Sequence, residues 1–154
     1  MSAATVERRQ HTAAPILFIR RQVSRAQLPA TIGECLGAVL AHAQKRGVAI
    51  TGPPFTRYPS AGPGEVTAEI GFKVATLVAG EGEIEAGTLA GGPVAFAVHK
   101  GPYEELGATY AALERFIAAE GGRPGGAPWE VYVTDPGEVP DPADWITEVY
   151  WPIA

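Results

Sequence analysis

The chain of 154 residues is poor in the residue types on which many metal and cofactor sites depend. It has one cysteine, Cys35, and three histidines. A single cysteine excludes an intrachain disulfide and any cluster of cysteine ligands, and it agrees with a reducing cytoplasm. The sequence contains no H-E-x-x-H, C-x-x-C, G-x-G-x-x-G or P-loop pattern, and no serine in a nucleophile elbow. We therefore expect neither a metal nor a cofactor.

Long apolar runs and positive charge are also scarce. No stretch approaches the roughly 20 apolar residues that a membrane-spanning helix needs, and residues 1–15 lack the apolar centre of a signal peptide. We expect a soluble, cytoplasmic protein in which residues 1–15 form a flexible N-terminal extension. With 12 Lys and Arg against 17 Asp and Glu, the net charge is -5. No basic field favours nucleic acid or an anionic membrane, so any electrostatic preference is for cations.

Glycine and proline, by contrast, are abundant and separate short apolar segments, which is typical of strands joined by turns. One helix is predicted to begin at Thr31 as its N-cap, with Glu34 at capping-box spacing, and to end at Gly47. A second helix is predicted over Tyr103–Glu120, and Glu81–Gly92 is predicted to be a polar connection. The remaining apolar segments predict strands at Ile16–Arg25, Val48–Tyr58, Val66–Val78, Pro93–Lys100, Trp129–Asp135 and Trp145–Ile153.

The order strand, helix, strand, strand occurs twice, which predicts half-repeats at 16–80 and 92–154. Residues 52–58 (GPPFTRY) match residues 126–132 (GAPWEVY) at an offset of 74 (126 − 52), and residues 69–74 (EIGFKV) match 148–153 (EVYWPI) at 79 (148 − 69). The sequence thus predicts an α+β fold: a duplicated βαββ unit with pseudo-two-fold symmetry, an antiparallel sheet, two helices and a central ligand cleft at the seam. Chance similarity of short Gly and Pro segments is the weaker alternative.

Two of the predicted strands combine glutamate with tyrosine on one face. Because successive side chains of a strand alternate, Glu130 shares a face with Tyr132, and Glu148 shares one with Tyr150. Such a face is either exposed to solvent or lines a polar, aromatic cavity, and the pattern leaves both open. An enclosed carboxylate between aromatic walls suits an organic cation and could also transfer protons. His99, with no Asp or Cys partner close in sequence, is interpreted as structural.

The run His99–Tyr103 before a helix, the segment Trp129–Tyr132 and the segment Thr147–Ile153 together resemble the GyrI-like small-molecule-binding domain. This is the effector-binding domain of some AraC-type and MerR-type multidrug regulators, also found as a stand-alone protein. The resemblance covers residues 16–154 and implies a cleft for hydrophobic, often cationic, compounds with a glutamate at its base, which corresponds to Glu130. It also implies aromatic walls. With the seam aromatics and the second carboxylate, the candidate ligand-binding residues are Glu130, Phe55, Tyr58, Phe72, Tyr103, Tyr110, Tyr132, Glu148, Tyr150 and Trp151.

Three functions follow as hypotheses. The first is a binding protein that senses or sequesters an amphipathic or cationic organic molecule, without direct contact to nucleic acid or membrane. The second, implied by stand-alone relatives that open cyclopropane rings of DNA-alkylating natural products, is a hydrolase with Glu130 or Glu148 as catalytic residues. The third is a gyrase-inhibitor-type modulator with a protein partner.

Overall fold

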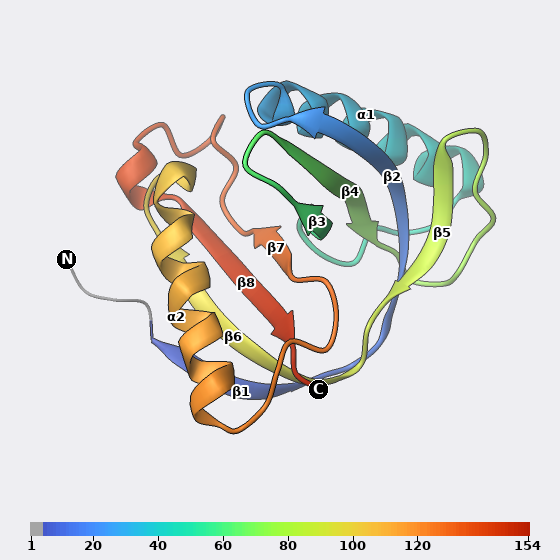
Figure 1. Ribbon diagram of the computed structural model, residues 1–154. Coiled ribbons are helices and arrows are strands. Elements are labelled where there is room, and N and C mark those ends of the chain that lie inside the picture. The colour runs from blue at the N-terminus through green and yellow to red at the C-terminus, as the bar shows by residue number, and fades with distance from the viewer. Residues whose placement is uncertain (1–4) are drawn as a thin grey trace. The chain divides into compact units, whose positions relative to one another are not determined.

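The computed structural model describes residues 5–154, which form two compact units with one α-helix each (Figure 1). The N-terminal unit is Thr12–Gly91; the C-terminal unit combines the chain up to His11 with Gly92–Ala154. The predicted α+β class with antiparallel strands is confirmed. The elements are β1 (Val6–His11), β2 (Ala14–Ser24), α1 (Leu28–Arg46), β3 (Phe55–Ala61), β4 (Glu65–Lys73), β5 (Ile84–Leu89), β6 (Gly92–Lys100), α2 (Leu106–Ala119), β7 (Trp129–Tyr132) and β8 (Ile146–Pro152), with short 3-10 helices at Tyr103–Glu105 and Pro142–Asp144.

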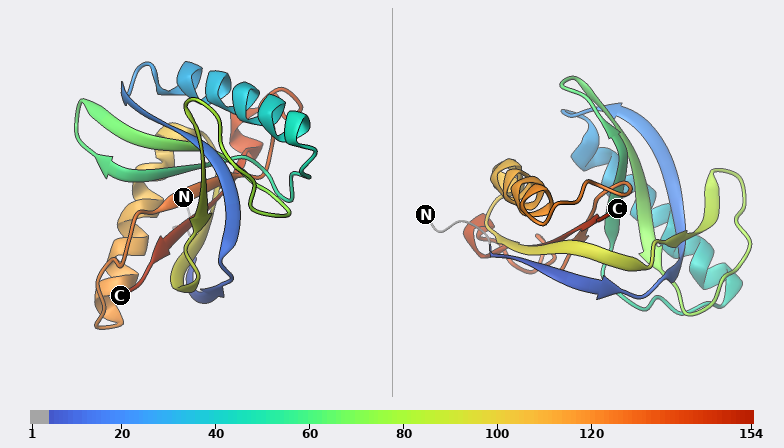
Figure 2. Two further views of the ribbon diagram at one scale, coloured as in Figure 1. Left: turned by 90° about the vertical axis from the view of Figure 1, so that its right-hand side faces the viewer. Right: turned by 60° about the horizontal axis from the view of Figure 1, so that its bottom comes forward.

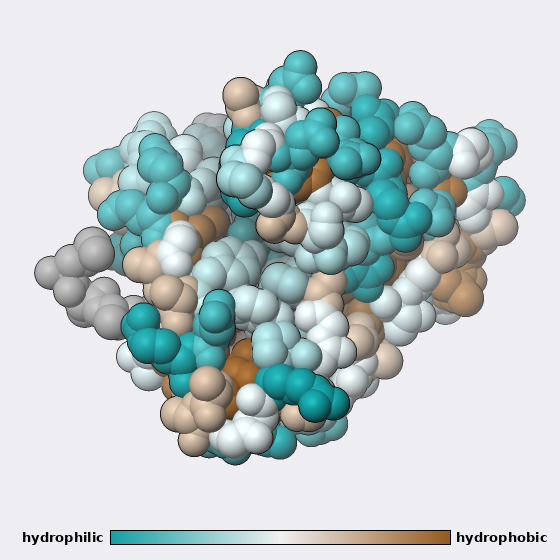
Figure 3. Space-filling view, viewed as in Figure 1, coloured by the Kyte–Doolittle hydropathy of each residue, from teal (hydrophilic) through white to brown (hydrophobic). Residues whose placement is uncertain are grey.

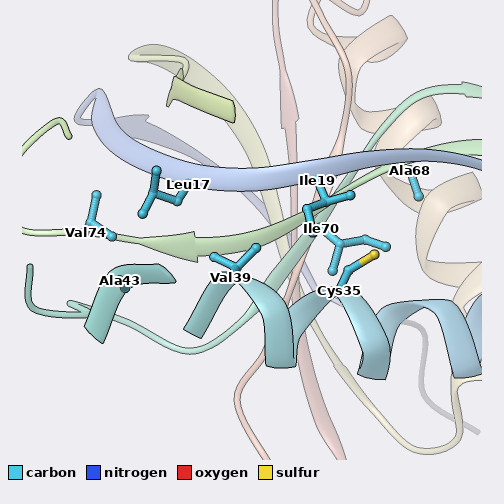
Figure 4. Close-up of a cluster of buried hydrophobic side chains, with 8 residues drawn as sticks. All are labelled: Leu17, Ile19, Cys35, Val39, Ala43, Ala68, Ile70 and Val74. Atoms are coloured by element: carbon cyan, nitrogen blue, oxygen red, sulfur yellow. The ribbon is translucent and has the colours of Figure 1, made fainter. Parts of the chain in front are cut away.

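In the N-terminal unit, four antiparallel strands lie in the order β3-β4-β2-β5, and α1 packs against one face of them. The alternation in β2 places Leu17 and Ile19 on the face under the helix, where burial of apolar surface is the main stabilising contribution. The opposite side of α1 is mostly exposed, as expected for an amphipathic helix, and Figure 3 shows mainly hydrophilic residues in the upper right of the molecule, where α1 lies in Figure 1. The buried cluster shown in Figure 4 consists of Leu17, Ile19, Cys35, Val39, Ala43, Ala68, Ile70 and Val74.

The C-terminal unit repeats this arrangement with strand order β1-β6-β8-β7 and with α2 along one face (Figure 2). Leu113 and Ile117 of α2 are fully buried against Val149 of β8. The whole buried cluster is Ala95, Ala97, Leu106, Leu113, Ile117, Val149 and Ile153. Each unit therefore has its own core under its own helix.

The two units exchange their edge strands. β1 precedes β2 in the chain yet pairs with β6, whereas β5 precedes β6 yet pairs with β2. The two pairings are equivalent in register: Val6 lies opposite Ala97, and Ile84 lies opposite Ile19. The same repeat offset of 78 relates Val6 to Ile84 (84 − 6) and Ile19 to Ala97 (97 − 19). Each repeat is thus a βαββ core that is preceded in the chain by one further strand. That strand pairs with the sheet of the other unit.

These edge strands correct two predictions. Of the expected flexible extension over residues 1–15, Val6–His11 is strand β1 and Ala14–Pro15 begins β2, while residues 1–4 lie outside the described part. Glu81–Gly92 contains strand β5 instead of being only a connection. Both segments are too polar to look like strands, but an edge strand gains backbone hydrogen bonds whatever its side chains, and charged residues are common at sheet edges.

The start of α1 also differs from the prediction, whereas its end is confirmed. The helix begins at Leu28 after Gln27, with a proline in the first turn, where no N–H is needed. Thr31 therefore lies inside the helix, and its hydroxyl donates to the Gln27 carbonyl oxygen at 3.0 Å instead of capping. Gly47 ends the helix with a left-handed φ of 69°, as its position predicts.

Candidate ligand-binding site

Strand β7 of the C-terminal unit places Glu130 on the face that α2 covers. Glu130 lies opposite Val149 in the antiparallel register, and residues that face each other across such a pair share one face of the sheet. Val149 belongs to the core under α2, so Glu130 faces the same helix. Tyr132, two residues along β7, lies on this face as well.

Two tyrosine hydroxyls bind the buried carboxylate of Glu130, whose exposed fraction is 6%. Tyr110 of α2 donates to Oε2 at 2.7 Å, and Tyr132 donates to Oε1 at 3.0 Å. A carboxylate that leaves water loses favourable hydration, and hydrogen bonds from both sides replace part of it. We call Glu130, Tyr110 and Tyr132 the Glu130 cluster.

Further aromatic rings surround this cluster within the same unit. The ring of Tyr103 lies 5.7 Å from that of Tyr132 and 4.8 Å from that of Trp145, and Trp151 meets Tyr110 edge-on at 6.0 Å. Trp145 was not among the predicted site residues. Its indole N–H donates to the Val139 carbonyl at 2.7 Å, which fixes the loop before β8. The sequence offered no signal for this beyond a large aromatic residue next to a strand.

Two carboxylates act on Tyr103 at this site, those of Glu130 and Asp135. Burial is the largest cause of a raised pKa at Tyr103, and the charges of Glu130 and Asp135 raise that pKa further. Burial, the larger cause, disfavours a charge of either sign at this place, whereas the two carboxylates disfavour a negative charge and favour a positive one.

The turn that presents Tyr103 is held by His99. One ring nitrogen, Nε2, lies 2.9 Å from the Pro102 carbonyl oxygen, and Nδ1 lies 3.1 Å from the Thr109 hydroxyl. Since a carbonyl only accepts, Nε2 carries the proton. Gly101 adopts a φ of 131°, which L-residues rarely adopt, and its N–H donates to the Trp145 carbonyl at 2.9 Å. The interpretation of His99 as structural agrees with these contacts.

Glu148 and Tyr150 lie on the opposite face of the same strands. Glu148 faces Val131 across β7 and Val98 across β6, so it points away from the α2 core. The Tyr150 hydroxyl donates to Glu148 at 3.0 Å, and the Tyr150 ring stacks on Trp129 at 5.2 Å. The structure therefore does not bring Glu130 and Glu148 together in one site.

The remaining candidates belong to the N-terminal unit. Phe55 is buried in β3, while Tyr58 and Phe72 pack against the core under α1. The repeat offset of 74 places Thr56 where the C-terminal unit has Glu130 (130 − 56). The carboxylate is thus a feature of one repeat only.

No group of three or more potential metal-ligating side chains occurs in residues 5–154. In the same range, no helix is long and apolar enough to cross a membrane.

Comparisons with known proteins identify the fold. The profile of the family described as GyrI-like small molecule binding domain matches residues 5–154. No curated protein matches the chain. Among solved structures, the C-terminal domain of EcmrR is similar at 22% identity and a TM-score of 0.83, over 99% of both chains. In the EcmrR–DNA complex the likeness covers 98% of this chain but only 57% of the EcmrR chain, at 20% identity and a TM-score of 0.85.

Two further structures show the same fold at lower identity. A hydrolase from Listeria innocua is similar at 14% identity and a TM-score of 0.69, over 97% of this chain and 91% of that chain. SAV2435, solved bound to tetraphenylphosphonium, is similar at 12% identity and a TM-score of 0.66, over 97% of this chain and 94% of that chain. These likenesses show the fold.

Proposed function

The chain belongs to the family of GyrI-like small-molecule-binding domains, and we propose that it binds hydrophobic organic cations at the Glu130 cluster. The observation that carries the proposal is a glutamate with an exposed fraction of only 6%, whose carboxylate is bound by two tyrosine hydroxyls with further aromatic rings beside them. Its charge attracts a cation, and the ring faces stabilise the apolar body.

The expected gain in binding free energy has two parts. A cation over an aromatic ring gains about 0.5–2 kcal/mol per good contact, depending on how far it is desolvated. A charge pair in a site of low dielectric adds to this, because water no longer screens it. Burial is the largest cause of the raised pKa of Tyr103, but the charges of Glu130 and Asp135 also raise it, and these two carboxylates would attract a cation.

A neighbouring structure supports the choice of probe. SAV2435, which shares the fold, was solved with tetraphenylphosphonium, a bulky cation without hydrogen-bond donors. For this chain we expect such a ligand to be recognised by charge and ring stacking alone. In the cell, such binding would sequester the compound or report its presence.

Isothermal titration with tetraphenylphosphonium tests this proposal. Glu130→Gln keeps the shape but removes the charge, and we expect the Kd to rise at least tenfold, which is about 1.4 kcal/mol. Glu148→Gln is a matched control, because it makes the same change on the opposite face of the sheet and should leave the Kd unchanged. Equal binding by wild type and Glu130→Gln would refute the role of the carboxylate.

Hydrolysis of an electrophilic natural product is the second candidate. The same geometry favours it, since the two tyrosine hydroxyls orient the Glu130 carboxylate, which would accept a proton from an attacking water molecule. The water oxygen would bond to a cyclopropane carbon while a C–C bond of the ring breaks, and the electron-withdrawing group that takes up the electron pair would then take up the proton. A hydrolase from Listeria innocua shares the fold. We would incubate the protein with a cyclopropane-bearing alkylator and follow the ring-opened product by mass spectrometry. A rate equal to that in buffer would exclude this activity for the compound tested.

A further inference from the structure

Glu148 has a counterpart in the N-terminal unit with very different surroundings. The repeat offset of 79 relates Glu148 in β8 to Glu69 in β4 (148 − 69), and the strand registers agree. Glu69 faces Arg20 across β2 and Arg57 across β3. At the corresponding places Glu148 faces Val98 and Val131.

In the N-terminal unit the two arginines enclose the carboxylate. Arg20 donates from Nε and a terminal nitrogen to Oε2 of Glu69, at 3.0 and 2.6 Å, and Arg57 donates from Nε to Oε1 at 2.6 Å. The Glu69 side chain is only 5% exposed. The molecule itself thus shows how a glutamate at this place is neutralised, namely by guanidinium groups.

In the part of the C-terminal unit that the structure describes, no guanidinium group is bonded to the corresponding carboxylate, although the charge of Arg9 acts on the neighbouring Tyr150. The partly buried Glu148 accepts a hydrogen bond from Tyr150, and within residues 5–154 no Lys, Arg or His nitrogen lies within 4.0 Å of its carboxylate. Lys100 is exposed on the same face of β6 but forms no ion pair in this range. Arg9 is paired with Glu7 and lies over the Phe96 ring at 3.7 Å.

The neighbours of Glu148 on both sides are valines: Val131, opposite on β7, is buried, whereas Val98, opposite on β6, is accessible. Val98, directly opposite, is 45% exposed, and so is Val133, whose N–H donates to the Ile146 carbonyl at 3.1 Å. These are two of the four large hydrophobic residues that are exposed in residues 5–154. Exposed apolar side chains beside a carboxylate with no bonded cation are typical of a binding surface.

We propose that Glu148, with Val98, Val133 and Tyr150, forms a second site, which takes a guanidinium group on an apolar stem. The planar guanidinium fork matches a carboxylate in two parallel hydrogen bonds, as an ammonium group cannot. The apolar stem would pack on Val98 and Val133. The group can come from a small alkylguanidine or from an arginine of a protein partner. This site is separate from the Glu130 cluster and does not depend on the function proposed for it.

Titration followed by NMR tests the site with two probes, butylguanidinium chloride and the peptide acetyl-Val-Arg-Val-amide. We expect amide shifts confined to β6, β7 and β8, and a Kd that rises about fivefold in Glu148→Gln, as for a partly exposed ion pair. Glu130→Gln should leave this Kd unchanged. A peptide that binds more tightly than butylguanidinium indicates an arginine of a partner, and equal binding indicates a small guanidine. Absence of shifts with both probes, or equal binding by Glu148→Gln, overturns the proposal.

A second variant tests the comparison between the repeats. Val98→Arg puts an arginine at the place that Arg20 occupies beside Glu69 (98 − 20 = 78, the offset of these strands). We expect the new guanidinium group to form hydrogen bonds with the Glu148 carboxylate. This should raise the Tm and abolish binding of both probes. Val98→Leu, which keeps an apolar residue there, should bind both probes like the wild type. Undiminished guanidinium binding by a folded Val98→Arg would contradict the proposal.

Discussion

At Glu130, two tyrosine hydroxyls supply hydrogen bonds that the carboxylate loses when it leaves water. The same residue influences Tyr103, whose pKa is raised by burial and by the negative charges of Glu130 and Asp135. The pKa of Tyr103 therefore reports how strongly the charge of Glu130 acts on its neighbours, without any ligand.

We predict that Glu130→Gln lowers the pKa of Tyr103 toward its ordinary value of 10.0, because one of the charges that raise it is removed. The measurement is a titration of tyrosinate absorbance near 295 nm, with Tyr103→Phe to identify the component. Because the folded pKa lies above the unfolded one, the contribution of Tyr103 to stability is full below pH 10.0 and decreases as the pH rises through the folded pKa. An unchanged titration would show that the charge of Glu130 does not act on Tyr103.

Sequence reasoning could identify the pairs of glutamate and tyrosine but not which pair faces α2. Alternation within a strand places Glu130 with Tyr132 and Glu148 with Tyr150, yet it does not say which face the helix covers. That depends on the register between β7 and β8, where Glu130 lies opposite the buried Val149. Trp145 was missed because it joins the cluster through a loop, whose path no periodicity encodes.

At the scale of elements, backbone contacts explain where prediction succeeded and where it failed. The repeat offsets and the end of α1 could be predicted from the sequence, because Gly47 and the matched segments are local patterns. The edge strands β1 and β5 could not be predicted, because their stability comes from hydrogen bonds to strands that are distant in sequence.

Two glycine substitutions should act in opposite directions. Gly37 lies inside α1, and a Cβ there would meet no other atom within 4 Å, so Gly37→Ala should stabilise the protein by about 0.5–1 kcal/mol. Gly71 of β4 lies opposite Phe18 and Phe55, and a Cβ there would overlap the Leu17 carbonyl. We expect Gly71→Ala to destabilise by about 1–3 kcal/mol. Urea unfolding of both variants measures this, and a stabilised Gly71→Ala would contradict the close approach of β2 and β4.

At the scale of the whole molecule, the exchange of β1 and β5 makes the two repeats depend on each other. A cut after Leu77, in the connection between β4 and β5, leaves each repeat without its edge strand but with the edge strand of the other repeat.

We predict that fragments 1–77 and 78–154 unfold without cooperativity when alone and regain a cooperative transition when mixed one to one. Circular dichroism during thermal unfolding measures this. Fragment 12–91, which contains a complete N-terminal unit with β5, is the control and should be better ordered than fragment 1–77. A fragment 1–77 that folds as well as fragment 12–91 would show that the exchanged strand contributes little.

The presence of Thr56 where the other repeat has Glu130 makes the two repeats chemically unequal within one fold. Both residues are buried in corresponding strands, β3 and β7. The N-terminal unit has a neutral hydroxyl at this place, whereas the C-terminal unit has an acid. The symmetry of the backbone therefore does not extend to the chemistry of its side chains, and of these two equivalent positions only one offers a carboxylate.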